Sequence, residues 1–162
     1  VQGPVMPSEM DYQTVLAASL RAQWQIDDVL RADEELDFSR PFLPEGLART
    51  ARAAGLDEDE RRTLNHLAGY EYIWMFGTVE EYVLPFVLDH ARPMLAHADY
   101  RVQALLNFAG EEAKHIQLFR RFAMAFARGF PTPPRLVNPR PFANAVLAKS
   151  PLGVALSILM VE

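Results

Sequence analysis

The sequence predicts an all-α fold, and three observations support this. Two long apolar segments, residues 57–95 and 99–128, each follow a helix start signal. No segment shows the strict alternation of apolar and polar residues that is typical of a strand. Half of the 162 residues are hydrophobic and 23% are charged, a globular composition in a chain long enough for one domain.

The chain before the first long segment predicts a helix, a break and a short helical turn. Ser8 with Asp11 three residues later resembles a capping box, so a first helix is expected over residues 10–30. Residues 37–47 contain two prolines that end it. A helical turn is then expected over residues 45–54.

The two long helices have defined starts and a defined end. Asp57 with Glu60 three residues later forms a capping box, and its acidic residues suit the positive end of the helix dipole. Asp99 can cap the helix that follows. Gly129 and Pro131 close that helix, so we expect a helical hairpin over residues 57–128.

The remainder predicts a crossover and the start of another core helix. Residues 131–141 hold five prolines, which predicts an extended connection, and we place this crossover at 129–149. An apolar run then predicts a further helix over 150–162. Because that run ends without a cap or a polar turn, we expect that residues 1–162 are one domain truncated at its C-terminus.

Composition excludes several classes of site. The net charge of −5 argues against nucleic acid as a partner, because phosphate binding favours a basic face. No apolar run reaches the length of about 20 residues that a membrane span needs, and the first residues do not resemble a secretory signal, so a cytoplasmic protein is expected. The chain has no cysteine, so any metal must be held by carboxylates and imidazoles.

The sequence "EEAKH" at residues 111–115 places charged groups where apolar groups are expected. Glu112 and His115 are three residues apart, so they share one face of the predicted helix with several phenylalanines. A buried charge is costly unless something neutralises it. Glu-x-x-His is the pair with which some helical bundles bind a metal, although a structural ion pair is the alternative.

A carboxylate on the preceding helix strengthens the metal interpretation. If the two long helices form an antiparallel hairpin that turns near His97, then Glu81 lies level with Glu112. Glu80 fits almost equally well. Both lie in apolar stripes, so periodicity does not separate them; Glu81 is the preferred ligand and Glu80 the alternative.

Taken together, these residues resemble the half-motif of the ferritin-like di-metal carboxylate superfamily. Glu81 is followed by twenty-nine residues and then by "EEAKH", a spacing similar to that in ribonucleotide reductase small subunits and arylamine N-oxygenases. The resemblance implies a ferritin-like helical bundle, incomplete here and preceded by an extra N-terminal helix. It implies that Glu81, Glu112 and His115 are metal ligands and that Glu112 bridges two metals.

Two further glutamates receive roles from the same resemblance. Glu162 follows the last apolar run, where the third ligand-bearing helix would supply its carboxylate. Glu111 is a weaker candidate, because Lys114 lies at helical spacing from it. A second Glu-x-x-His is absent from the sequence, so truncation, a site shared by two chains and a non-catalytic protein all remain open.

The function implied by the resemblance is oxidation at a di-iron centre, with manganese as the other metal considered. Such a centre would activate dioxygen and oxidise a small organic substrate. A reductant protein and a second copy of the chain are the protein partners considered. The alternatives are a non-catalytic helical interaction domain and an iron storage protein.

Overall fold

The computed structural model describes residues 9–97, 99–132, 134, 138 and 140–160. These residues form α-helices and short 3-10 helices and contain no strand, so the predicted all-α class is confirmed for this part of the chain. The α-helices are α1 (Glu9–Arg21), α2 (Ile26–Val29), α3 (Glu45–Ala48), α4 (Glu58–Ala91), α5 (Tyr100–Gly129), α6 (Arg140–Leu147) and α7 (Pro151–Leu159), and the 3-10 helices are η1 (Thr50–Arg52) and η2 (Arg92–Met94).

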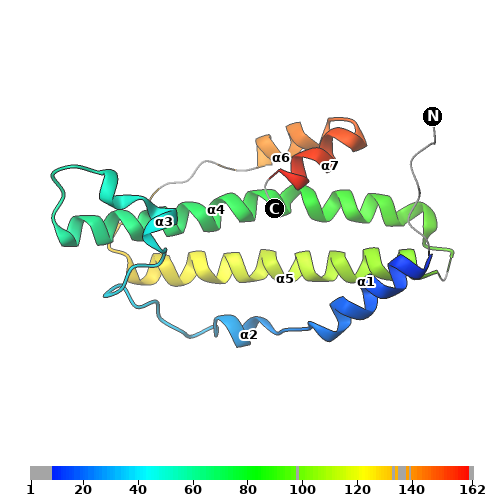
Figure 1. The fold of residues 1–162 in the computed structure, drawn as a ribbon, viewed down its shortest axis with the longest axis horizontal. Helices are drawn as coiled ribbons and strands as arrows, with labels where there is room; N and C mark the ends of the chain where they lie inside the picture. The colour runs from blue at the N-terminus through cyan, green and yellow to red at the C-terminus, as the bar shows by residue number, and fades with distance from the viewer. Residues whose placement is uncertain (1–8, 98, 133, 135–137, 139, 161–162) are drawn as a thin grey trace.

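The helices α4 and α5 form the predicted antiparallel hairpin and run side by side along the long axis of the molecule (Figure 1). Asp57 caps α4 in a capping box, in which the Glu60 N–H donates to Asp57 and the Asp57 N–H donates to Glu60, both at 2.9 Å. Asp99 caps α5 by accepting a hydrogen bond of 2.9 Å from the Val102 N–H. Both predicted starts are therefore confirmed.

Residues 9–34, called here the N-terminal segment, lie along α5 on the side away from α4 (Figure 1). The single helix predicted over residues 10–30 is wrong, because the chain leaves the helix after α1 and starts again at α2 with Gln25 as its N-cap. The carbonyl of Trp24 accepts a hydrogen bond of 3.2 Å from the Lys114 ammonium on α5 instead of one from its own helix. Docking onto α5 thus replaces the regular helix here.

Asn65 on α4 holds the segment before α3. Its side-chain oxygen accepts hydrogen bonds from the N–H groups of Phe42 and Leu43 at 2.7 and 2.9 Å, and its side-chain nitrogen donates to the Leu43 carbonyl at 2.7 Å. The neighbouring His66 bonds the Arg40 carbonyl at 2.8 Å through its Nε2. Both side chains are buried, so an irregular segment is fixed to the hairpin by satisfied polar groups.

The helices α6 and α7 cover the opposite side of α4 (Figure 1). Buried residues of α4, α5, α6 and α7 together form a core cluster: Val79, Tyr82, Val83, Val87, Ala109, Ala143, Val146 and Val154. The prediction of an extended crossover over 129–149 is wrong at Arg140–Leu147, because these residues form the helix α6. Pro141 does not prevent this, because a proline is tolerated in the first turn of a helix. The helix expected over 150–162 is present as α7 from Pro151 to Leu159, with Ser150 as its cap, and residues 161 and 162 lie outside the described part of the chain.

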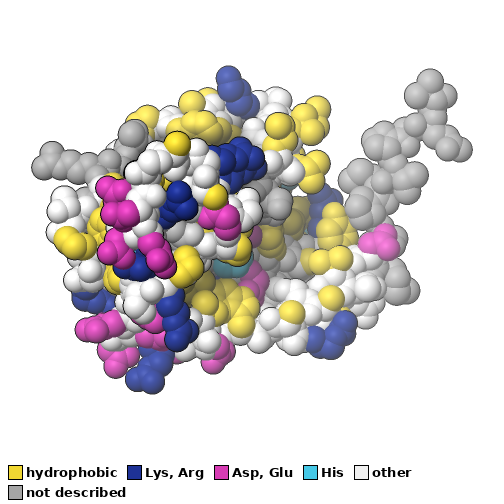
Figure 2. Space-filling model, turned by 60° about the vertical axis from the view of Figure 1, so that its left-hand side comes forward, with side chains coloured by type: hydrophobic (Ala, Val, Ile, Leu, Met, Phe, Trp, Pro, Cys, Tyr) yellow, Lys and Arg dark blue, Asp and Glu magenta, His cyan; other side chains and the backbone are white. Residues whose placement is uncertain are grey.

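Charged side chains of both signs are interspersed over the face shown in Figure 2, rather than gathered in one basic patch. Ion pairs near the surface include Arg62 with Asp59 at 2.6 Å and Arg92 with Asp89 at 2.8 Å. Pairs of this kind stabilise a fold by less than about 1 kcal/mol each. In the part of the chain that the structure describes, no helix combines the length and apolar character needed to cross a membrane.

The Asn65 contacts predict a clear stability effect. Asn65→Ala removes three hydrogen bonds and leaves partly buried backbone groups without partners, so the free energy of unfolding should fall by about 2–3 kcal/mol. Urea denaturation measures it. Gln117→Ala, which removes only an exposed bond to the same helix, is the control and should change stability by less than about 0.5 kcal/mol. Equal stability of the two variants would contradict this role of Asn65.

Candidate metal centre

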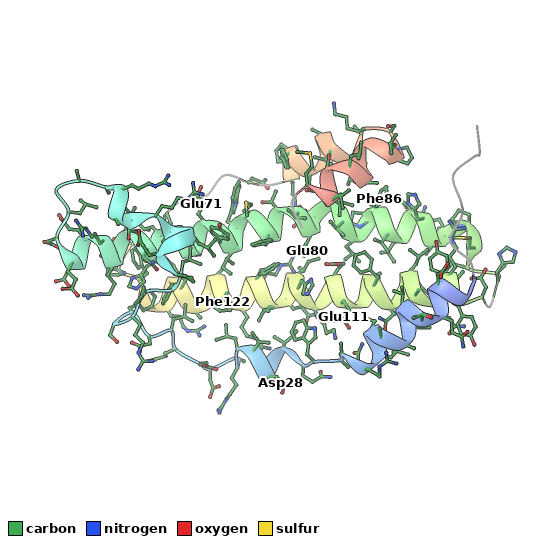
Figure 3. All side chains as sticks on the ribbon, viewed as in Figure 1. Asp28, Glu71, Glu80, Phe86, Glu111 and Phe122 are labelled. Atoms are coloured by element: carbon green, nitrogen blue, oxygen red, sulfur yellow. The ribbon has the colours of Figure 1, made fainter. Side chains whose placement is uncertain are left out.

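Three titratable side chains converge between α4 and α5. They are Glu80 from α4 and Glu112 and His115 from α5, and their potential ligand atoms all lie within 4.8 Å of one another. The Nδ1 atom of His115 lies 3.0 Å from the Glu112 Oε2 atom and 3.5 Å from the Glu80 Oε1 atom. Figure 3 shows Glu80 in the space between the two long helices.

The placement of Glu112 and His115 follows from the sequence. Residues three apart on a helix share a face, and here that face is turned toward α4. The predicted proximity of these two residues is confirmed by the hydrogen bond that joins their side chains. The carboxylate from the other helix is the part that the sequence left open.

The structure brings Glu80, rather than the preferred Glu81, to the imidazole of His115. Glu80 is 5% exposed and belongs to the three-residue group, whereas Glu81 is half-buried and lines a separate groove with Trp74 and Arg120. One residue turns a helix by about 100°, so the two side chains point in different directions.

The packing of α4 against α6 agrees with the placement of Glu80 toward α5. Tyr82 packs against Phe142 of α6, with ring centroids 6.3 Å apart, and lies about 200° around α4 from Glu80. Periodicity alone could not show this, because both candidate stripes on α4 are apolar. The covering helices, which lie far along the chain, decide between them.

The other two candidate ligands lie outside the group. Glu111 on α5 faces the N-terminal segment (Figure 3), where it pairs with Lys114 at 2.7 Å and accepts a hydrogen bond of 3.0 Å from Gln23. Its predicted pairing with Lys114 is confirmed. Glu162 lies outside the described residues.

The three clustered groups differ in protonation because their surroundings differ. Burial raises the pKa of Glu80 to about 7, although the hydrogen bond with His115 acts in the opposite direction. Burial also disfavours ionised Glu112, but hydrogen bonds with His115 and Glu80 outweigh it, so the pKa of Glu112 is lowered. The hydrogen bonds with Glu112 and Glu80 raise the pKa of His115 to about 10. Without a metal, protonated His115 therefore balances the charge of Glu112.

One oxygen of this group has no partner among the described residues. The Oε2 atom of Glu80 is buried and makes no hydrogen bond with any of them. A buried polar atom without a partner is costly, by about 1–3 kcal/mol, and such atoms are rare in folded proteins. A cation bound between the three residues would satisfy this oxygen, so the donor set fits a metal ion.

Trp24 covers the imidazole of His115, and the sequence analysis did not identify it. The two rings stack with centroids 5.8 Å apart and an interplanar angle of 20°. The Lys114 ammonium lies 4.9 Å from the centroid of the Trp24 ring, a cation–π distance. The segment between α1 and α2 therefore forms one wall of the candidate site.

Polar residues at seven-residue intervals on α5 hold this wall in place. Their partners follow one another along the N-terminal segment: Asn107 contacts Ser19, Lys114 contacts Gln23 and Trp24, Arg121 contacts Asp27 and Leu30, and Arg128 contacts Glu34. Because seven residues are about two helical turns, the four side chains share one stripe. This spacing is the sequence signal that would have indicated a docked segment.

Comparisons of this chain with protein-family models, with curated proteins and with solved structures find no match. The geometry of the three clustered residues is therefore the evidence on which a function can be proposed.

The raised pKa of His115 predicts how stability depends on pH in the metal-free protein. A folded-state pKa above the ordinary value of 6.5 stabilises the fold fully below pH 6.5, and this contribution is lost as the pH rises toward 10. The free energy of unfolding should therefore fall between pH 6.5 and 9, and His115→Asn should reduce that fall. Urea denaturation with a chelator present measures it.

His90→Asn is the matched control for this measurement. His90 is exposed and bonds only a carbonyl of its own helix, at 3.0 Å, so its replacement should leave the pH dependence unchanged. The same pH dependence in His115→Asn as in the unaltered protein would show that the ion pair of His115 does not stabilise the fold.

Proposed function

We propose that Glu80, Glu112 and His115 bind a divalent metal ion as part of a di-iron centre, with manganese as the other candidate. The convergence of these three side chains around an unpartnered buried oxygen carries the proposal. Two carboxylates and one imidazole offer hard oxygen donors and a nitrogen donor, a set suited to iron and manganese. Two carboxylate charges would also be neutralised by a divalent ion.

The arrangement supports a ferritin-like bundle as the wider architecture. Di-metal carboxylate bundles use a glutamate from each of two helices and a Glu-x-x-His pair from each of two others. The hairpin α4–α5 supplies one glutamate and one such pair, which is half of that set. A second set of the same kind would complete a two-metal centre.

We infer that the protein oxidises a small organic substrate. When bound, the iron pair would supply the electrons with which dioxygen is reduced. The residues of this chain contribute the surroundings. Trp24 and Phe119 lie against the His115 ring, at centroid distances of 5.8 and 6.2 Å, and the His115 side chain is 38% exposed.

The same cluster can hold a proton in place of a metal. The hydrogen bond of 3.0 Å between His115 and Glu112 supports the alternative of a non-catalytic helical domain stabilised by an ion pair. Iron storage is the other alternative, and it would use the same ligands without oxidising a substrate. A non-catalytic helical domain would bind no metal, which distinguishes it from the proposal. A storage protein would bind iron but would show no substrate-dependent oxygen consumption.

Metal affinity should depend on Glu80 and not on Glu81. Glu80→Ala and Glu112→Ala each remove a ligand and should weaken the binding of Mn²⁺ or anaerobic Fe²⁺ at least tenfold, as measured by calorimetric titration. Glu81→Ala is the matched control, since the neighbouring glutamate lines a different groove, and should change affinity less than twofold. Absence of metal binding by the unaltered protein would refute the proposal.

Oxygen consumption tests the proposed chemistry in the intact iron-loaded protein. With a reductant present, substrate-dependent oxygen uptake should occur, and Glu112→Ala should abolish it because the metal is not held. A storage protein would instead take up iron with no dependence of oxygen uptake on an organic substrate.

A further inference from the structure

A cavity of about 330 Å³ lies beside the candidate metal centre, between α4, α5 and the segment before α3. Aromatic rings make up most of its wall. The lining residues are Leu36, Phe42, Leu43, Gly69, Tyr70, Tyr72, Ile73, Phe76, Phe119, Phe122 and Phe126. Figure 3 shows Phe122 on α5, further along the hairpin from Glu80.

The lining decides which molecules can bind. Among the residues that the structure describes, no charged side chain contributes to it, and Tyr70 and Tyr72 carry its only side-chain polar groups. A carboxylate or phosphate moved into such a wall would lose its hydration without gaining a partner, which costs several kcal/mol. An uncharged apolar group would instead be stabilised by burial, at about 25 cal/mol per Å².

The volume indicates the size of the ligand. A cavity of about 150 Å³ with an apolar wall holds one benzene ring. The cavity here is about twice as large, so it would accommodate two fused rings or one ring with a short alkyl chain. It also falls at the lower end of the range of about 300–1,000 Å³ that is typical of small-molecule sites.

The chain itself roofs this cavity, so it is not an open helix face. Phe42 and Leu43 belong both to the wall and to the segment that Asn65 holds by three hydrogen bonds. Gly69 permits the close approach, because a Cβ atom at that position would lie 3.1 Å from the Cβ atom of Phe42. The partly open, preformed shape suits a small molecule rather than a helix or a peptide.

One end of the cavity reaches the residues next to the metal ligands. Phe76 lies one helical turn before Glu80, and Phe119 lies one turn after His115. The rings of Phe76 and Phe119 are stacked at 6.1 Å, and the Phe119 ring lies 6.2 Å from that of His115. A molecule in the cavity would therefore lie about one helical turn from the candidate centre.

We propose that this cavity binds the uncharged aromatic portion, of about two rings, of the substrate that the centre oxidises. The assignment as a substrate site rests on the proposed function, whereas the binding of an apolar ring molecule rests on the cavity alone. The experiment therefore measures ring binding and metal binding separately.

The uncharged naphthalene dye prodan is a direct probe, because its emission shifts to shorter wavelength in an apolar site. The metal-free full chain should bind it saturably at one site. Leu36→Trp places a bulky ring in the wall and should weaken binding at least tenfold. Leu47→Trp, at an exposed position outside the wall, is the matched control and should change affinity less than twofold. Naphthalene should displace the dye, and 2-naphthoate should do so at least tenfold more weakly.

Equal dye affinity in Leu36→Trp and Leu47→Trp, or equal displacement by the charged and uncharged competitors, would overturn the proposal. Bound Mn²⁺ should broaden the proton signals of bound naphthalene in the unaltered protein and not in Glu112→Ala. Metal binding without dye binding would refute the cavity assignment alone. Dye binding without metal binding would support the cavity and refute the proposed metal centre.

Discussion

The structure depends on one constraint, the burial of two carboxyl groups side by side between α4 and α5. Glu80 and Glu112 are 5% and 2% exposed, and two ionised carboxylates at such positions would repel each other in surroundings that solvate them poorly. The repulsion is relieved if Glu80 is protonated, as its pKa of about 7 allows, or if a positive charge lies between the two groups. His115 supplies it as a protonated imidazole, and a divalent metal ion would supply it with a larger charge and would also coordinate the unpartnered oxygen of Glu80. The proposed metal function and the stability of the hairpin are two consequences of the same constraint.

The surrounding elements hold this cluster in its geometry from two sides. On one side, α6 packs on Tyr82 of α4, which lies about 200° around that helix from Glu80. On the other side, the polar residues at seven-residue intervals on α5 bind the N-terminal segment. One of them, Lys114, bonds the Trp24 carbonyl, and the Trp24 ring stacks on that of His115. The ion pair between Lys114 and Glu111 is partly buried, so solvent and salt screen its attraction less than they screen a surface pair. The ligand geometry therefore depends on residues that would not themselves contact a metal.

The sequence was sufficient for those parts of the fold that local signals encode. The capping residues Asp57 and Asp99 and the spacing of Glu112 and His115 are properties of single helices, and the structure reproduces them. The structure brings Glu80, rather than the preferred Glu81, into the cluster, and this choice depends on how α4 packs against helices much later in the chain. The interruption of the first helix was missed for a similar reason, since it results from docking of Trp24 on α5. Long-range packing, rather than local propensity, decided both points.

The central claim is that one cation is held jointly by Glu80, Glu112 and His115. Anomalous diffraction at the iron absorption edge, from crystals of this chain equilibrated with Fe²⁺ without air, tests it most directly. The account predicts a peak within about 2.0–2.3 Å of a carboxylate oxygen of both glutamates and of the His115 Nδ1 atom. A peak bound by Glu81 in place of Glu80, or an imidazole that stays paired with Glu112 while iron binds elsewhere, would contradict it.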